Sequence, residues 1–174
     1  MNSVVIMGVA GCGKSSLGMA VAQQLGLPMI EGDDHHSAES RGKMQRGIAL
    51  ADADRAGWLA ALGLQLQQHP GGLVLTCSAL KRSYREQLRH ASPGLQFVYL
   101  HISREDAVSR VAGRGASHFF SATLVDSQFD TLEEPSGEPG VLRIDALQPL
   151  AALQAESCRW LMTQTPHQDQ RGND

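Results

Sequence analysis

Residues 8–16, the stretch "GVAGCGKSS", combine residue types and a spacing that bind phosphate. Gly8, Gly13, Lys14 and Ser15 match the phosphate-loop pattern G-x-x-x-x-G-K-[ST] in full, after an expected strand and before an expected helix. Glycines let consecutive backbone N–H groups turn toward an anion, and the start of the helix adds its positive dipole end. Lys14 can reach the β- and γ-phosphates of a nucleotide, and the Ser15 hydroxyl suits Mg²⁺. A chance glycine-rich turn is the alternative, and the complete pattern argues against it.

A carboxylate and two histidines follow in the stretch "EGDDHH" of residues 31–36. Asp33 ends an expected strand, so it should emerge at the carboxyl edge of the sheet beside the phosphate loop. There it could accept the proton of an attacking hydroxyl or hold a water on Mg²⁺, whereas capping a turn is the alternative. His35 and His36 point to opposite sides of an extended chain and do not suit one metal ion. We expect His36 to form a hydrogen bond and His35 to be exposed.

Basic side chains gather in the middle of the sequence. Arg55, Lys81 and Arg85 suit an anionic acceptor, because guanidinium and ammonium groups pair with carboxylate and phosphate. Lys81 and Arg85 are four residues apart and share one face of an expected helix that begins beside Ser78. Solvent-exposed helix faces would explain the same spacing without any binding role.

A second arginine pair precedes a glycine-containing stretch. Arg110 and Arg114 are four residues apart and lead into "GASHFF" of residues 115–120. This arrangement is typical of a lid that closes over ATP, excludes water and sets positive charge against the transferred phosphoryl group. The end of a solvated helix is the alternative.

The bulk composition fits one globular domain of 174 residues, with 42% hydrophobic and 19% charged residues. A net charge of −3 argues against a general nucleic-acid-binding protein. Cys12, Cys77 and Cys158 form no Cys-x-x-Cys pair, which favours a reduced, cytoplasmic compartment and no structural zinc. No apolar run approaches about 18 residues, so we expect no membrane span.

Strand-like and helix-like segments alternate along the chain. The expected strands are 3–9, 27–33, 73–77, 95–102 and 141–145, and the expected helices are 14–25, 58–69, 81–90, 103–114, 121–132 and 149–162. This alternation predicts an α/β fold, a parallel sheet with helices on both faces and ligands beyond the carboxyl ends of its strands. We expect a single domain over residues 1–165 and a flexible polar tail over residues 166–174.

The phosphate loop alone does not define the reaction. A GTPase would carry an Asn-Lys-x-Asp motif, but the asparagines are Asn2 and Asn173. No apolar strand ends in the aspartate typical of motor ATPases, because the third strand ends at Cys77 and Ser78. For a chain of this size, the pattern favours a small-molecule kinase.

The sequence resembles the gluconokinases of the shikimate-kinase-like group of P-loop kinases. The resemblance rests on the phosphate loop and on four further stretches, "GDDHHSAESRGKMQRGIALADADRAGWL", "CSALKRSYREQLR", "FVYLHI" and "HFFSATLVDSQFDTLEEP". Together they run from about residue 4 to residue 150, nearly the whole chain. The segments that contain "CSALK", "DADR" and "HFF" are specific to this family.

The resemblance implies Mg²⁺- and ATP-dependent transfer of a phosphoryl group to the 6-hydroxyl of D-gluconate, in sugar-acid catabolism that feeds the pentose phosphate or Entner–Doudoroff route. It implies a five-stranded parallel sheet of order 2-3-1-4-5, as in P-loop NTPases and nucleoside-monophosphate kinases. It also implies a lid over about residues 110–120 and a homodimer.

By matching position, the resemblance assigns catalysis to Asp33 and Lys14 and Mg²⁺ to Ser15 and Asp33. The residues expected to bind ATP are Gly8, Val9, Ala10, Gly11, Cys12, Gly13, Lys14, Ser15, Ser16, Arg110 and Arg114. The residues expected at or near the acceptor are His36, Arg55, Ser78, Lys81, Arg85, His118 and Gln128. His118 and Gln128 match motif positions without a definite role.

Four positions depart from the family pattern. Ser37, Ala49 and Gly57 replace prolines, and Ser40 replaces asparagine. Fewer prolines predict a substrate-binding segment that is more mobile when empty. A kinase for another small hydroxy acid, such as shikimate, is the alternative among enzymes. A regulatory module that holds ATP without turnover is the alternative of another class, and a scaffold role would leave the glycine loop unexplained.

Overall fold

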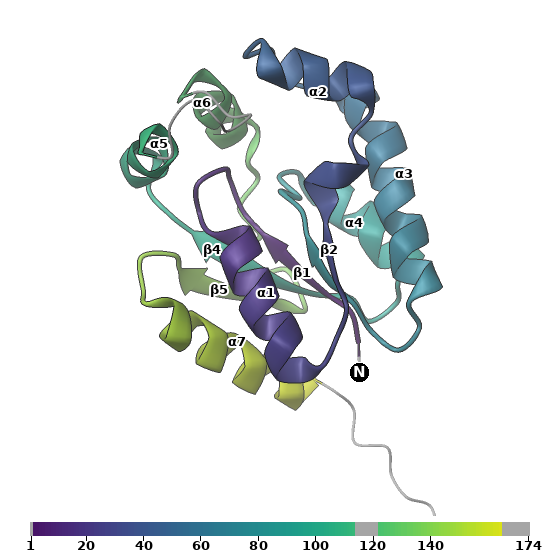
Figure 1. Ribbon diagram of the computed structural model, residues 1–174. Coiled ribbons are helices and arrows are strands. Elements are labelled where there is room, and N and C mark those ends of the chain that lie inside the picture. Colours follow the sequence, from purple (N-terminus) through teal and green to yellow (C-terminus); the bar gives the residue numbers. More distant parts are fainter. Residues whose placement is uncertain (1, 114–121, 165–174) are drawn as a thin grey trace, which may run out of the picture.

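A computed structural model describes residues 2–113 and 122–164 of the protein. Five parallel strands form one sheet in the order β2-β3-β1-β4-β5, which confirms the predicted topology (Figure 1). The strands are β1 (Val4–Met7), β2 (Met29–Glu31), β3 (Val74–Thr76), β4 (Gln96–His101) and β5 (Val141–Asp145). Because every strand runs the same way, all five carboxyl ends lie at one edge of the sheet, where ligands bind in this class of fold.

Helices cover both faces of the sheet, as predicted for an α/β fold (Figure 1). They are α1 (Lys14–Leu25), α2 (Ala38–Gln45), α3 (Asp52–Gln68), α4 (Arg82–Ala91), α5 (Arg104–Ala112), α6 (Ala122–Thr131) and α7 (Leu150–Gln164). Along β1, Val4 and Ile6 pack with α1 and α7, whereas Val5 and Met7 pack with α3 and α4. This alternation follows from the two-residue period of a strand and divides the core into two layers.

The segment between β2 and β3 departs most from the predicted elements. A 3-10 turn η1 (Gly32–His35) and the helix α2 were not predicted, and α3 begins at Asp52 rather than near residue 58. These helix starts were missed because α2 has little apolar periodicity and both helices begin at capping hydrogen bonds. The Ser37 hydroxyl accepts from the Ser40 backbone N–H at 3.0 Å, and the Asp54 carboxylate accepts from the Ala51 N–H at 2.9 Å. Figure 1 shows α2 above the sheet edge, opposite α5 and α6.

Two predicted features lie at the limits of the described residues. The lid expected over about residues 110–120 is described only as far as Gly113, and the tail expected over residues 166–174 lies outside the described residues. The domain boundaries therefore stay a prediction. Within the described ranges, no helix is long and apolar enough to cross a membrane.

Gly32 joins β2 to the turn that carries Asp33, and its lack of a side chain is a packing requirement. A Cβ at this position would lie 2.2 Å from the Thr76 carbonyl oxygen, closer than any real contact. The Thr76 hydroxyl also accepts from the Gly32 N–H at 3.3 Å and donates to the Glu31 carboxylate. The backbone of β3 therefore fixes the point at which the chain leaves β2.

We expect Gly32→Ala to lower the free energy of unfolding by about 1–3 kcal/mol, because the methyl group would force the backbones of β2 and β3 apart. Urea unfolding would measure this change. Gly57→Ala is a matched control in α3, where an added Cβ would meet no atom within 4 Å. The free energy of unfolding of the control should equal that of the wild type or exceed it by about 0.5–1 kcal/mol, because alanine is a better helix former than glycine. Equal losses in the two variants would contradict the packing argument.

Candidate active site

The phosphate loop connects β1 to α1 at the ligand-binding edge of the sheet. Gly8, Gly11 and Gly13 adopt φ angles of 140°, 82° and 103°, which residues with a side chain rarely adopt. A Cβ at Gly8 would lie 2.9 Å from the Leu100 carbonyl oxygen, so the loop also needs glycine in order to pack closely against β4. The loop therefore keeps the conformation that lets its backbone N–H groups face an anion.

Lys14 places a positively charged side chain on this loop. Its Nζ donates to the carbonyl oxygens of Gly8 and Val9, at 3.1 Å each. Ser15 and Ser16 follow in the first turn of α1, where both are exposed. The arrangement leaves an accessible hydroxyl and a positively charged helix end at the place where phosphate oxygens would bind.

Asp33 faces the loop from η1, and its side chain is 52% exposed. Burial by the surrounding protein raises the pKa of this carboxyl, but hydrogen bonding to His36 and the charge of Lys14 lower it more. The net pKa lies below the ordinary value of 3.8. Asp33 is therefore ionised at neutral pH and can accept a hydrogen bond from a hydroxyl.

His36 is buried beside Asp33, with its Nε2 3.7 Å from the Asp33 carboxylate. Its ring stacks on the Trp58 indole at 4.3 Å between centroids, and its Nδ1 has no hydrogen-bond partner among the described residues. Trp58 in turn donates from Nε1 to the Gly32 carbonyl at 2.7 Å. The ring therefore has one nitrogen, Nε2, near the Asp33 carboxylate and one buried nitrogen, Nδ1, that could pair with a ligand group.

Sequence reasoning missed Trp58. The signal that could have found it is its spacing of three residues from Arg55, which places both side chains on one face of α3.

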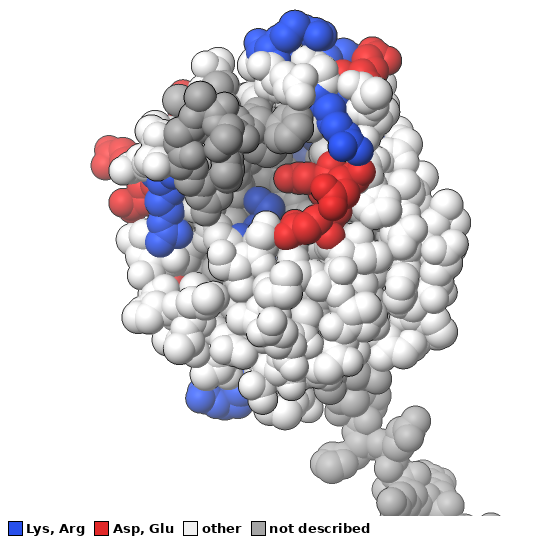
Figure 2. Space-filling model, viewed as in Figure 1, with Lys and Arg blue, Asp and Glu red and all other residues white. Residues whose placement is uncertain are grey.

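These side chains line one pocket at the sheet edge. Its lining residues are Lys14, Asp33, His36, Met44, Ala49, Leu50, Arg55, Trp58, Ser78, Leu124, Ser127 and Gln128. Six residues predicted from the sequence are thus brought together from β-strand ends, α1, α3 and α6. Figure 2 shows the hollow on this side of the molecule, with acidic side chains along one edge and basic side chains inside it.

Arg55 provides the pocket with a second cation. The residue is buried, and its Nη1 donates to the Leu50 carbonyl oxygen. No described residue accepts a hydrogen bond from its Nε or Nη2, so these N–H groups remain available to a ligand. A planar guanidinium in this position suits a carboxylate or phosphate oxygen.

Lys81 lies outside the pocket lining. Its Nζ donates to both Asp52 carboxylate oxygens at 2.8 Å, and Tyr84 donates its hydroxyl proton to the same carboxylate. The three side chains join the start of α4 to the start of α3, which carries Arg55. The structure thus gives Lys81 an acidic partner within the protein, and its predicted contact with the acceptor stays a prediction.

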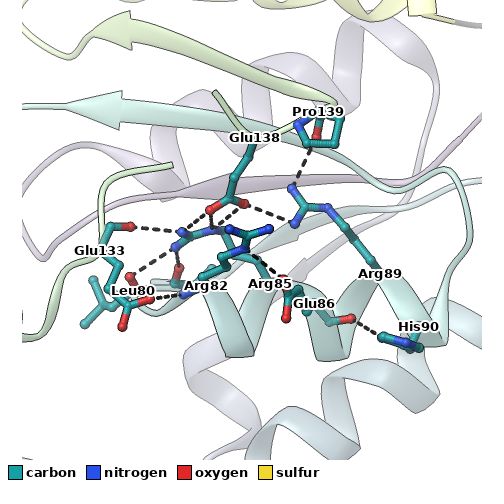
Figure 3. Close-up of polar contacts among 10 residues, drawn as sticks. Leu80, Arg82, Arg85, Glu86, Arg89, His90, Glu133, Glu138 and Pro139 are labelled. Atoms are coloured by element: carbon teal, nitrogen blue, oxygen red, sulfur yellow. Dashed lines mark hydrogen bonds and ion pairs between the residues drawn. The ribbon is translucent and has the colours of Figure 1, made fainter. Parts of the chain in front are cut away.

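The placement of Arg85 contradicts its predicted role at the acceptor (Figure 3). The side chain is fully buried and all five of its N–H groups have partners within the protein. Nε and Nη2 donate to the Glu138 carboxylate, Nη2 also donates to the Glu133 carbonyl, and Nη1 donates to the Ala79 and Leu80 carbonyls. The two side chains do not share one helix face as predicted, because Lys81 is the N-cap residue before α4 and pairs with Asp52, whereas Arg85 turns toward Glu133 and Glu138. Its function is structural.

Arg110 is the described member of the predicted arginine pair. Arg110 donates to the Cys12 carbonyl at 3.5 Å and to the Ala146 carbonyl at 3.1 Å, so it joins the phosphate loop to the connection between β5 and α7. Arg114 and His118 lie outside the described residues. In residues 2–113 and 122–164, no group of three or more His, Cys, Asp or Glu side chains could hold a metal ion by itself.

A phosphate loop at the carboxyl edge of a 2-3-1-4-5 parallel sheet, facing a carboxylate beyond β2, defines a P-loop kinase that uses ATP. The shikimate kinase family model matches residues 10–129. A gluconokinase of Gluconobacter oxydans is 44% identical over 81% of this chain and 80% of its own length. The thermosensitive gluconokinase of Escherichia coli K12 is 39% identical over 91% of this chain and 86% of its own.

A solved structure extends this similarity to three dimensions. The crystal structure of a gluconokinase from Sinorhizobium meliloti 1021 matches with a TM-score of 0.82 and 44% identity, over 94% of this chain and 97% of that one. The chain belongs to the gluconokinase family.

Proposed function

We propose that this enzyme transfers the γ-phosphoryl group of ATP to the 6-hydroxyl of D-gluconate, giving 6-phospho-D-gluconate and ADP. The observation that carries the proposal is a single pocket in which Asp33 and Arg55 face Lys14 of the phosphate loop. Arg55 has N–H groups without an acceptor among residues 2–113 and 122–164, which can bind the carboxylate of a sugar acid, and Asp33 is ionised for contact with a hydroxyl. The gluconokinase relatives provide the identity of the acid.

Each pocket residue has a different role in the proposed reaction. Asp33 accepts a hydrogen bond from the attacking hydroxyl and takes its proton as the new P–O bond forms and the bond to the leaving ADP oxygen breaks. Lys14 offsets negative charge on the phosphate oxygens, and the loop N–H groups hold them in line. With a pKa below its ordinary value, Asp33 is a weak base, so its larger contribution is to orient the hydroxyl.

Mg²⁺ fits the exposed Ser15 hydroxyl and the ionised, half-exposed Asp33 carboxylate. Mg²⁺ in kinases commonly takes one or two protein oxygens and completes its shell with water and phosphate, so a larger protein cage is unnecessary. When bound, the ion would neutralise charge on the β- and γ-phosphates. Ser15 and Asp33 would be the protein groups that hold it.

We expect Asp33→Asn to lower kcat by about 10²–10⁴-fold while leaving ATP affinity within a few-fold of the wild type, because the amide cannot take a proton. Since the pKa of Asp33 is lowered, the carboxylate is charged above pH 3.8 and loses its charge only at lower pH. Any decline of kcat/KM between pH 8 and 5 should therefore have the same shape in both proteins. Steady-state rates across this range provide the test, and wild-type turnover in the variant would exclude Asp33 from the mechanism.

The position of phosphorylation can be read directly from the product by proton-coupled ³¹P NMR. A phosphate ester at carbon 6 couples to two protons of a CH₂ group and gives a triplet-like signal. An ester of any secondary hydroxyl couples to one proton and gives a doublet. A doublet as the main product signal would contradict transfer to the 6-hydroxyl.

We also propose a cytoplasmic location, a homodimer and a role in gluconate catabolism. Cys12, Cys77 and Cys158 are all free and buried, which fits a reducing compartment. Light scattering of the purified protein would measure the oligomeric state.

A further inference from the structure

Gln128 of α6 reaches the phosphate loop. The Ala10 backbone N–H donates to its Oε1 at 2.6 Å, although the two residues are 118 positions apart. Gln128 also lines the pocket that contains Asp33 and Arg55. One side chain therefore contacts the loop that holds the nucleotide phosphates and the space that holds the acceptor.

The contact with Ala10 fixes the orientation of the Gln128 amide. A backbone N–H can be accepted only by the amide oxygen, because the amide nitrogen is a donor. Oε1 therefore faces the loop, and Nε2 with its two N–H groups is the end left for the pocket. No described residue accepts a hydrogen bond from this Nε2.

The helix that carries Gln128 is anchored on both sides. Arg104 of α5 donates to Asp126 at 3.1 Å and to Asp130 at 2.8 Å, and its guanidinium lies 5.2 Å from the Phe129 ring centroid. Just beyond α6, the Glu133 N–H donates to the Leu80 carbonyl at 2.9 Å. A binding group is effective when its own backbone is held in this way.

We propose that Gln128 determines acceptor specificity by donating from Nε2 to an oxygen of the bound sugar acid while the Ala10 N–H holds Oε1. The inference rests on the proposed function, because it names a further contact of the same acceptor. It also links the two substrates, since the acceptor oxygen and the phosphate loop are held by opposite ends of one rigid amide.

Gln128→Glu and Gln128→Met test this assignment. The glutamate keeps an oxygen that can accept from Ala10 but replaces the donor with negative charge, and the methionine removes both contacts at similar volume. We expect both variants to raise KM for D-gluconate about tenfold or more, with the larger effect for glutamate because it also repels the acceptor carboxylate. The Kd for ADP should change less than KM for D-gluconate in both variants, because the nucleotide keeps the other N–H groups of the phosphate loop.

Gln154→Glu is the matched control. Gln154 lies on α7, where its Nε2 donates to the Ala20 carbonyl at 2.9 Å, away from the pocket, so its replacement should leave KM for gluconate unchanged. An unchanged KM in both Gln128 variants, with altered ADP affinity or Tm, would show that Gln128 only joins α6 to the loop and would overturn the inference. If the wild type itself failed to phosphorylate gluconate, the proposed function would be overturned and this inference with it.

Discussion

Replacing Lys14 by methionine is expected to lower kcat by about a thousandfold or more. Lys14 Nζ lies on the phosphate loop, 3.1 Å from the Gly8 and Val9 carbonyls, where a nucleotide phosphate can replace these weak partners. Loss of one positioned donor from a phosphoryl-transfer site commonly costs a factor of about 10²–10³, and a full positive charge costs more. Methionine keeps the apolar stem, so the loop should retain its conformation.

The change in kcat would be measured as ADP release at saturating ATP and gluconate. Lys43→Met is the matched control, because Lys43 is paired with Asp54 at 2.6 Å on α2 and does not line the pocket. The control should keep kcat within about twofold, because Lys43 does not line the pocket and its charge is already paired with Asp54. Activity above a tenth of the wild type in Lys14→Met would contradict the assignment of the phosphate loop.

Arg85→Met is expected to lower the free energy of unfolding by about 3–5 kcal/mol, because it leaves the buried Glu138 carboxylate without its main partner. Arg89 still donates to Glu138 at 3.0 Å, which favours the lower end of this range. For a chain of this size, such a loss lowers Tm by about 6–20 °C. At a temperature where the variant stays folded, KM for gluconate should be unchanged, because Arg85 has no N–H group free for a ligand.

Arg82→Met is the matched control on the same helix. Among the described residues its guanidinium pairs with Glu86 alone, at the surface, so we expect the free energy of unfolding to change by no more than about 0.5 kcal/mol. In the double variant Arg85→Met with Glu138→Leu, removal of the unpaired carboxylate should recover part of the loss. If Arg85→Met instead raised KM for gluconate without changing Tm, the result would support the original prediction that Arg85 binds the acceptor.

The same ion pair should make stability depend on pH. Burial raises the pKa of Glu138, but hydrogen bonds from Arg85 and Arg89 lower it more, so the net pKa lies below 4.5. A lowered carboxyl pKa stabilises the fold above the unfolded value and loses that effect as pH falls through the folded value. The stability gap between the wild type and Arg85→Met should therefore narrow below about pH 4.5.

Local patterns accounted for the strands, the phosphate loop and the placement of Asp33, whereas the strand order was implied by the family resemblance. The glycine pattern at residues 8–13 and the end of β2 are properties of contiguous residues, so the sequence predicts them directly. Helix α2 was missed because a capping hydroxyl at Ser37, rather than an apolar period, begins it.

The remaining contacts of the site depend on residues that are far apart in the sequence. The spacing of Lys81 and Arg85 predicted a shared helix face, but not that Asp52 and Glu138 would be their partners. Glu138 lies 53 residues from Arg85, and Gln128 lies 118 residues from Ala10. Contacts at such separations follow from how the helices pack, which no local pattern encodes.

The most direct test of the account is ADP release by the wild-type enzyme with ATP and Mg²⁺ against D-gluconate, L-idonate, shikimate, glucose and no acceptor. We predict rapid release with D-gluconate, little with shikimate or glucose, and none above background without an acceptor. Binding of ATP without acceptor-dependent release, or preference for shikimate over gluconate, would contradict the assignment of this enzyme as a gluconokinase.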